Sequence, residues 1–200
     1  NLNHNINNKE ISMDNNFFSS QSRTDLAVEL NETVDKEDTA YSGVKVREHT
    51  DGITGIKITE LTITSKEGEK LFNKEQGTYI TIEASECSMG DSDYDASLIG
   101  IVTERLRDVV EPFIVNNRSI LVIGLGNRDI TADSLGPQVV EGLHVNRHIV
   151  TCNSNDCRLS SLVPGVMAQT GMETSQIVKG IVATSKPGVV IVIDALAARN

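Results

Sequence analysis

Two aspartates, Asp133 and Asp194, follow apolar runs that are typical of buried β-strands. Asp133 comes shortly after the run Ser119-Ile-Leu-Val-Ile-Gly-Leu-Gly-Asn127, and Asp194 ends the run Gly188-Val-Val-Ile-Val-Ile-Asp194. Continuous β-branched runs favour strands that are covered on both faces, as in a parallel sheet. In such sheets, catalytic groups lie beyond the carboxyl ends of the strands. Two carboxyl groups at one edge can share a proton and activate a water molecule, so this pattern favours hydrolysis.

Each aspartate also has a purely structural interpretation. Asp133 precedes Ser134-Leu-Gly-Pro137 and could cap the helix that Pro137 opens. Asp194 ends an apolar strand without a neighbouring base, and a buried, unpaired carboxylate is costly to desolvate, which favours a functional role. The competing explanation for Asp194 is a salt bridge with Arg199.

Two glycines, Gly124 and Gly126, follow the first strand as they would in a dinucleotide-binding loop. The third glycine of that fingerprint is replaced by Asp129, whose charge would repel a pyrophosphate, so a nucleotide site is disfavoured. The glycines instead allow a tight turn and a close approach to a substrate peptide. We expect the backbone N–H groups from Gly124 to Asn127 to stabilise an oxyanion. A second glycine-rich loop, 162–175, has a composition found both in cleft-lining loops and in tight connections.

A cluster of zinc-ligand residue types lies between the two runs: His144, His148, Cys152 and Cys157. His144 and His148 would share one face of a predicted helix, but the spacing of the four matches no standard zinc module. We therefore interpret them as surface residues. The three cysteines are an odd number without a disulfide framework, which indicates a reducing cytosol.

The length and composition limit the classes to which the protein can belong. Two hundred residues suffice for one domain with a core. The net charge of −10 argues against nonspecific binding to nucleic acid, which needs clustered Lys and Arg. A basic protein substrate is compatible with that charge. No run approaches the roughly 18 apolar residues of a membrane helix, so no membrane association is expected.

The N-terminal half is predicted to contain antiparallel strands. Residues 1–22 are rich in Asn and Ser and lack a periodic apolar pattern, so we expect a mobile tail there. Apolar and polar residues alternate in three later segments, which indicates strands with one solvated face: 44–46, 56–63 and 79–83. A short helix is expected at 65–72 and an acidic loop at 85–95.

The rest of the chain is predicted to alternate helices and strands. A helix beginning at Asp95 is amphipathic, with an apolar stripe formed by Leu98, Ile101, Val102, Leu106, Val109, Val110 and Phe113. Two further helices, from Pro137 to His148 and over 170–184, flank an irregular stretch at 151–163. The order strand, helix, strand predicts a right-handed parallel crossover. The expected fold class is thus α/β, a largely parallel sheet with flanking helices plus an N-terminal antiparallel β section.

Several ordered sequence blocks between positions 23 and 199 resemble the germination protease of spore-forming bacteria. The blocks are Ser22-Arg-Thr-Asp-Leu-Ala-Val-Glu29, Val122-Ile-Gly-Leu-Gly-Asn127, Asp133-Ser-Leu-Gly-Pro137, Arg147-His148, Val163-Pro-Gly-Val-Met167, Thr170-Gly-Met-Glu-Thr-Ser175 and Ile193-Asp-Ala-Leu-Ala-Ala-Arg199. The resemblance implies an atypical aspartic-type endopeptidase that starts the degradation of small acid-soluble spore proteins at germination. Asp133 and Asp194 match its two essential aspartates. It further implies a homotetramer in the cytoplasm of the spore core, without a cofactor.

The resemblance also implies a zymogen that removes its own propeptide. The cut would fall between Asp25 and Leu26, which makes residues 1–25 the propeptide and agrees with the polar, mobile tail expected there. Residues 26–200 would then be the N-terminal part of an α/β peptidase domain, because members of the family continue for about as many residues again.

Two other functions are compatible with the residues. Hydrogenase-maturating endopeptidases have a similar layout, in which acids at equivalent strand ends hold a metal. Here Asp133 and Asp194 would be two ligands, with a third from His148 or from the later part of the family's domain. The non-enzymatic alternative is a module that binds spore proteins through its acidic surface without cutting them.

Overall fold

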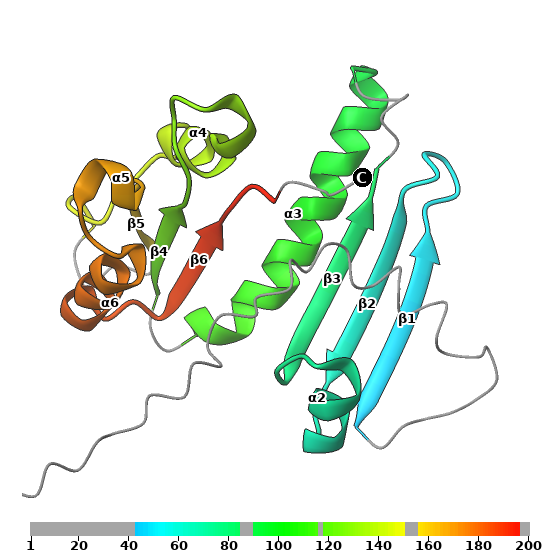
Figure 1. Cartoon of the computed structure of the whole chain (residues 1–200). Helices are drawn as coiled ribbons and strands as arrows, with labels where there is room; N and C mark the ends of the chain where they lie inside the picture. The colour runs from blue at the N-terminus through cyan, green and yellow to red at the C-terminus, as the bar shows by residue number, and fades with distance from the viewer. Residues whose placement is uncertain (1–42, 85–89, 116–117, 151–155, 197–200) are drawn as a thin grey trace, which may run out of the picture.

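The computed structural model describes residues 43–84, 90–115, 118–150 and 156–196. Several predictions fall on other residues: the mobile tail, the Asp25–Leu26 cleavage site, Cys152 and Arg199 all lie outside the described part of the chain. The described elements form two three-stranded sheets with helices beside them, which confirms the predicted α/β class (Figure 1).

The first sheet is antiparallel, as the alternating pattern predicted. It consists of β1 (Val44–Thr50), β2 (Lys57–Ile63) and β3 (Gly77–Glu83) in the order β1-β2-β3. Ile58 of the central strand packs on one face of the sheet, whereas Leu61 packs on the other face. The expectation of one solvated face is therefore wrong for β2, because helices cover parts of both faces.

The helix α2 (Lys66–Phe72) lies between β2 and β3, where a short helix was predicted. The Ser65 hydroxyl accepts the N–H of Gly68 at 3.0 Å and caps its start. Asn73 ends it in the left-handed conformation, with φ of 47°. Phe72 packs with Leu61 and Ile63 on one face of the sheet.

The long helix α3 (Ser92–Ile114) crosses the opposite face of the antiparallel sheet (Figure 1). It starts before the predicted Asp95, because the Asp91 carboxylate accepts the N–H groups of Asp93 at 3.0 Å and Tyr94 at 3.5 Å. Tyr94 packs with Ile56 and Ile58 in the core.

The N-cap of α3 gives a first testable prediction. Changing Asp91 to Ala should lower the free energy of unfolding by about 1 kcal/mol, because two first-turn N–H groups lose their acceptor. Urea titration measures this loss. Ser92→Ala is the matched control, since Ser92 is exposed and does not cap the helix. Equal stabilities of the two variants would contradict the cap.

Only the first half of the predicted apolar stripe of α3 is covered. Leu98 and Ile101 pack against the core of the antiparallel sheet. Four residues further along the same stripe are between 43% and 65% exposed: Val102, Leu106, Val109 and Phe113. Arg105 lies on this helix and forms an ion pair with Glu60 of β2 at 3.1 Å. The helix also contacts the second sheet at β6.

The second sheet is parallel and contains the two aspartate-bearing runs. Its strands are β4 (Ser119–Gly124), β5 (Arg158–Leu162) and β6 (Val189–Ile193), in the order β5-β4-β6. The central strand β4 is buried at Leu121, Val122 and Ile123. On the edge strand β6, in contrast, Val190 is 37% and Val192 53% exposed, so the expectation of two covered faces holds for β4 alone.

The strand β5 corrects the prediction that 151–163 is irregular. It pairs with β4 in parallel, and Ser160 donates its hydroxyl to the Ile120 carbonyl at 3.2 Å. The outer edge of β5 is covered by Asn146, whose side chain accepts the N–H of Leu159 at 2.7 Å. The pairing partner, rather than local strand propensity, makes this polar segment a strand.

Three short helices connect the parallel strands: α4 (Leu135–Glu141), α5 (Met167–Thr170) and α6 (Thr174–Ser185). The helix predicted up to His148 ends at Gly142. The helix predicted over 170–184 is present as α6 but begins later, at Thr174, because Gly171 adopts a φ of +68° and ends the preceding helix α5. None of the helices in the described ranges is both long and apolar enough to cross a membrane.

Candidate active site

Asp133 is the last residue of the short 3-10 helix η2 (Thr131–Asp133) between β4 and α4, and the backbone of Asn127 holds it in place. The N–H of Asn127 donates to Oδ2 of Asp133 at 2.7 Å and to the Asp133 carbonyl at 3.1 Å. The residue at the N-cap of α4 is Ser134, so Asp133 does not have the capping role that was the alternative. Its half-buried carboxylate is instead fixed by a backbone donor, which leaves Oδ1 for another partner.

The tight turn predicted at Gly126 is present and is required by Asp133. Gly126 has a φ of +112°, and a Cβ atom there would overlap the carbonyl oxygen of Asp133 and lie 3.0 Å from its Oδ1. A side chain at this position would therefore push the Asp133 loop outward. The close approach at Gly126 is thus made to the backbone carbonyl of Asp133.

This turn gives a second prediction. Gly126→Ala should destabilise the chain by at least about 1–3 kcal/mol, since it combines an unfavourable φ with a backbone overlap. Gly171→Ala is the matched control: its φ is +68°, but a Cβ there meets nothing within 4 Å. Urea unfolding should thus show a larger loss for Gly126→Ala, and equal losses would exclude the overlap.

Asp194 directly follows β6 and is exposed. Its Oδ1 accepts the N–H of Ala195 at 2.9 Å. The argument from a buried carboxylate is therefore wrong for this residue, because β6 is an edge strand within the described chain. Neither Asp133 nor Asp194 forms an ion pair with any Lys, Arg or His that the structure describes. The proposed partner Arg199 lies outside those residues.

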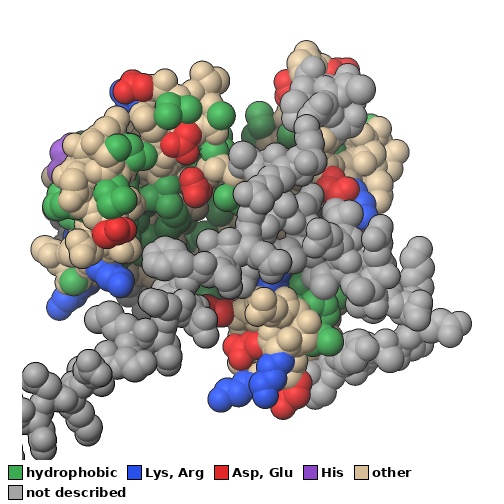
Figure 2. Space-filling view, viewed as in Figure 1, with side chains coloured by type: hydrophobic (Ala, Val, Ile, Leu, Met, Phe, Trp, Pro, Cys, Tyr) green, Lys and Arg blue, Asp and Glu red, His purple; other side chains and the backbone are tan. Residues whose placement is uncertain are grey.

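A backbone hydrogen bond connects the ends of β4 and β6. Asp133 and Asp194 therefore both follow neighbouring strands at the carboxyl end of the parallel sheet. The N–H of Leu125 donates to the Ile193 carbonyl at 2.8 Å. Gly136, in the first turn of α4, fits against both ends: a Cβ there would lie 2.6 Å from the Ile193 oxygen and 2.7 Å from the Leu125 nitrogen. In Figure 2, acidic side chains lie among hydrophobic side chains over this part of the molecule.

A residue that sequence reasoning missed, Gln169, reaches this loop from α5. Its Nε2 donates to Oδ1 of Asn127 at 3.3 Å. The same Oδ1 accepts the N–H of Asp129 at 3.0 Å. The glycine-rich composition of 162–175 pointed to this loop as cleft-lining or connecting, but nothing in the sequence distinguished Gln169 from its neighbours.

The sequence model of a family described as germination protease matches residues 21–200. The chain therefore belongs to the germination protease family. It is 40% identical over 192 residues to the germination protease of Bacillus pumilus, covering 90% of this chain and 51% of the relative. The germination protease of Clostridium tetani is 36% identical, and the match covers 89% of this chain and 56% of the relative. The germination protease of Bacillus subtilis is 39% identical, and the match covers 88% of this chain and 50% of the relative. The chain spans about half the length of these curated relatives.

In this member of the germination protease family, the two histidines do not lie on the helix that was predicted to carry them. His144 and His148 follow the end of α4 at Gly142, so they do not share a helical face. Cys152 lies outside the described residues. Within the described ranges, His, Cys, Asp and Glu side chains nowhere gather in groups of three or more that could hold a metal ion.

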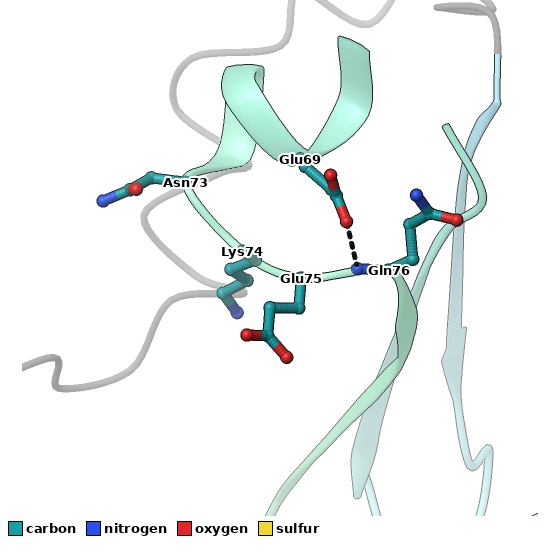
Figure 3. Close-up of a pocket in the computed structure, with 5 residues that line it drawn as sticks. All are labelled: Glu69, Asn73, Lys74, Glu75 and Gln76. Atoms are coloured by element: carbon teal, nitrogen blue, oxygen red, sulfur yellow. Dashed lines mark hydrogen bonds between the residues drawn. The ribbon is translucent and has the colours of Figure 1, made fainter. Parts of the chain in front are cut away.

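A cavity of about 620 Å³ lies beside α2, and neither Asp133 nor Asp194 lines it. It is lined by residues of α2 and of its connection to β3: Glu69, Asn73, Lys74, Glu75 and Gln76. Glu69 accepts the N–H of Gln76 at 3.2 Å and so closes this turn (Figure 3). The Glu69 carboxylate thus serves the turn, and the cavity is not part of the candidate site in this family member.

Proposed function

We propose that this chain carries the catalytic acids of an aspartic-type endopeptidase of spore germination. The observation that supports this most is the Leu125–Ile193 hydrogen bond, which joins the strand ends preceding Asp133 and Asp194. Together with membership of the germination protease family, it favours a site at the carboxyl ends of β4 and β6.

The proposed reaction is hydrolysis by a carboxylate pair that shares one proton. The proposed reaction needs one acid of the pair in its ionised form and the other in its protonated form. The ionised acid takes a proton from water while the water oxygen bonds to the peptide carbonyl carbon. The protonated acid donates to the carbonyl oxygen. The C–N bond of the resulting intermediate then breaks, and the amine leaves with a proton from the pair.

The proposed substrates are small acid-soluble spore proteins, and the proposed first substrate is the chain itself at Asp25–Leu26. A net charge of −10 favours the approach of a basic protein. Activity is further proposed to reside in a homotetramer in the cytoplasm of the spore core, formed by the family's full-length chain.

The test uses a full-length form incubated with a basic small acid-soluble spore protein. Mass spectrometry should identify new internal termini in the spore protein, and a new N-terminus at Leu26 in the protease. A stable complex without new termini would instead identify a binding module. Cleavage that stops with a chelator and returns with Zn²⁺ would assign the metal-dependent alternative, in which Asp133 and Asp194 are ligands.

A further inference from the structure

Two of the backbone donors expected to stabilise an oxyanion are already used. The N–H of Leu125 binds the Ile193 carbonyl, and the N–H of Asn127 binds Asp133. Each is a single donor, so neither remains for a substrate carbonyl. A hydrolytic site at this edge therefore has fewer free backbone donors than expected, and a side-chain donor would add to them.

The side chain of Asn127 is oriented to supply that donor. Its Oδ1 accepts two hydrogen bonds, from the Asp129 N–H at 3.0 Å and from Gln169 Nε2 at 3.3 Å. An amide oxygen offers two lone pairs, so these partners fix which way the amide faces. The Nδ2 group, with its two hydrogens, then points away from Asp129 and Gln169. In the described part of the chain, no hydrogen bond occupies it.

We propose that Nδ2 of Asn127 is a catalytic donor, which binds the carbonyl oxygen of the scissile peptide bond. This inference rests on the proposed function. Asn127 holds the Asp133 carboxylate through its own backbone N–H, so the acid and the carbonyl donor are set at a fixed separation by one residue. A pre-oriented amide stabilises the negative charge that grows on the oxygen without having to reorganise during the reaction.

Gln169 is the positioning residue for this amide. It belongs to α5, far from Asn127 in sequence, and reaches it across the loops that follow β4 and β5. Gly165 makes room for the glutamine side chain, since a Cβ there would lie 3.2 Å from Gln169 Oε1. Loss of Gln169 should leave Asn127 in place while allowing its amide to rotate.

The test measures kcat and KM of full-length variants on a small acid-soluble spore protein. Asn127→Ala should lower kcat about 10²–10³-fold with little change in KM, as expected for a donor that acts in the transition state. Gln169→Ala should lower kcat about 10-fold, again with KM retained. Gln176→Ala, which changes an exposed glutamine of α6, is the matched control and should match the wild type.

Two comparisons separate the possible outcomes. If folded Asn127→Ala keeps kcat within threefold of the wild type while Asp133→Asn is inactive, the donor role is overturned and the proposed function stands. An active Asp133→Asn variant overturns the proposed function itself. Thermal unfolding checks that Asn127→Ala is folded. If it is not, Gln169→Ala decides: lower kcat at constant KM supports the donor, and unchanged kcat overturns it.

Discussion

Replacing either Asp133 or Asp194 with asparagine is expected to lower kcat of the full-length protease by about 10²–10⁴-fold, the range of general acid–base catalysis. Asparagine has nearly the size of aspartate but can neither take a proton from water nor return one to the leaving amine. In Asp133→Asn, the side-chain oxygen can still accept the Asn127 N–H, so the loop should keep its shape. The loss should therefore appear in activity and leave stability close to that of the wild type.

The measurement follows both the cleavage of a spore protein and the release of residues 1–25. Asp156→Asn is the matched control, because Asp156 is exposed and lies just before β5, at the opposite end of the parallel sheet from the family aspartates. Wild-type rates in either Asp133→Asn or Asp194→Asn would remove that residue from the mechanism. A lower rate in Asp156→Asn would show instead that surface charge governs the rate.

The strands that carry the site were predictable because their composition leaves few alternatives. The run at 119–124 is apolar enough to demand burial on both sides, and β4 is indeed the buried centre of the parallel sheet. The alternating segments of the N-terminal half likewise became β1, β2 and β3. The parallel pairing of β4 with β6 followed from the helices between them.

The elements that sequence reasoning missed depend on tertiary contacts. Arg158-Leu-Ser-Ser-Leu162 has no strong strand propensity, and it forms β5 because β4 and Asn146 supply hydrogen bonds on its two sides. The predicted start of α6 at Thr170 is wrong because Gly171 adopts a left-handed conformation that a periodic apolar pattern does not reveal. A periodic pattern indicates that a helix exists more reliably than it indicates where the helix ends.

The distinction between local sequence properties and tertiary contacts also applies to the site. Asp133 and Asp194 were identified because they follow strands, which is a local property. The exposure of Asp194 and the contact of Gln169 with Asn127 depend on which segments meet in space, and no single-sequence spacing encodes them. The role of the Asn127 N–H was likewise hidden, since its partner is set by the course of the loop.

The glycine that brings the two strand ends together should also tolerate substitution poorly. A Cβ at Gly136 would overlap the Leu125 carbonyl and lie 2.6 Å from the Ile193 oxygen, so it meets rigid backbone atoms on both strands. Gly136→Ala is expected to cost about 1–3 kcal/mol through overpacking. Breaking the Leu125–Ile193 hydrogen bond would add about 1 kcal/mol.

The same change should lower activity, because the overlap moves the end of β4 away from the end of β6. A displacement of about 1 Å between reacting groups can reduce the rate about 100-fold. Urea unfolding and kcat of full-length Gly136→Ala test both effects. Gly180→Ala is the matched control: Gly180 lies inside α6 and a Cβ there meets nothing within 4 Å, so alanine should stabilise the chain by about 0.5–1 kcal/mol.

The two measurements together test whether the hydrogen-bonded contact between the ends of β4 and β6 aligns Asp133 and Asp194. If Gly136→Ala loses stability but keeps full activity at a temperature where it remains folded, the alignment of Asp133 and Asp194 does not depend on this contact. The hydrolytic pair would then have to be aligned by other parts of the full-length protein. If kcat falls in the folded variant while Gly180→Ala behaves as the wild type, the backbone contact at Gly136 links the packing of α4 to the separation of Asp133 and Asp194.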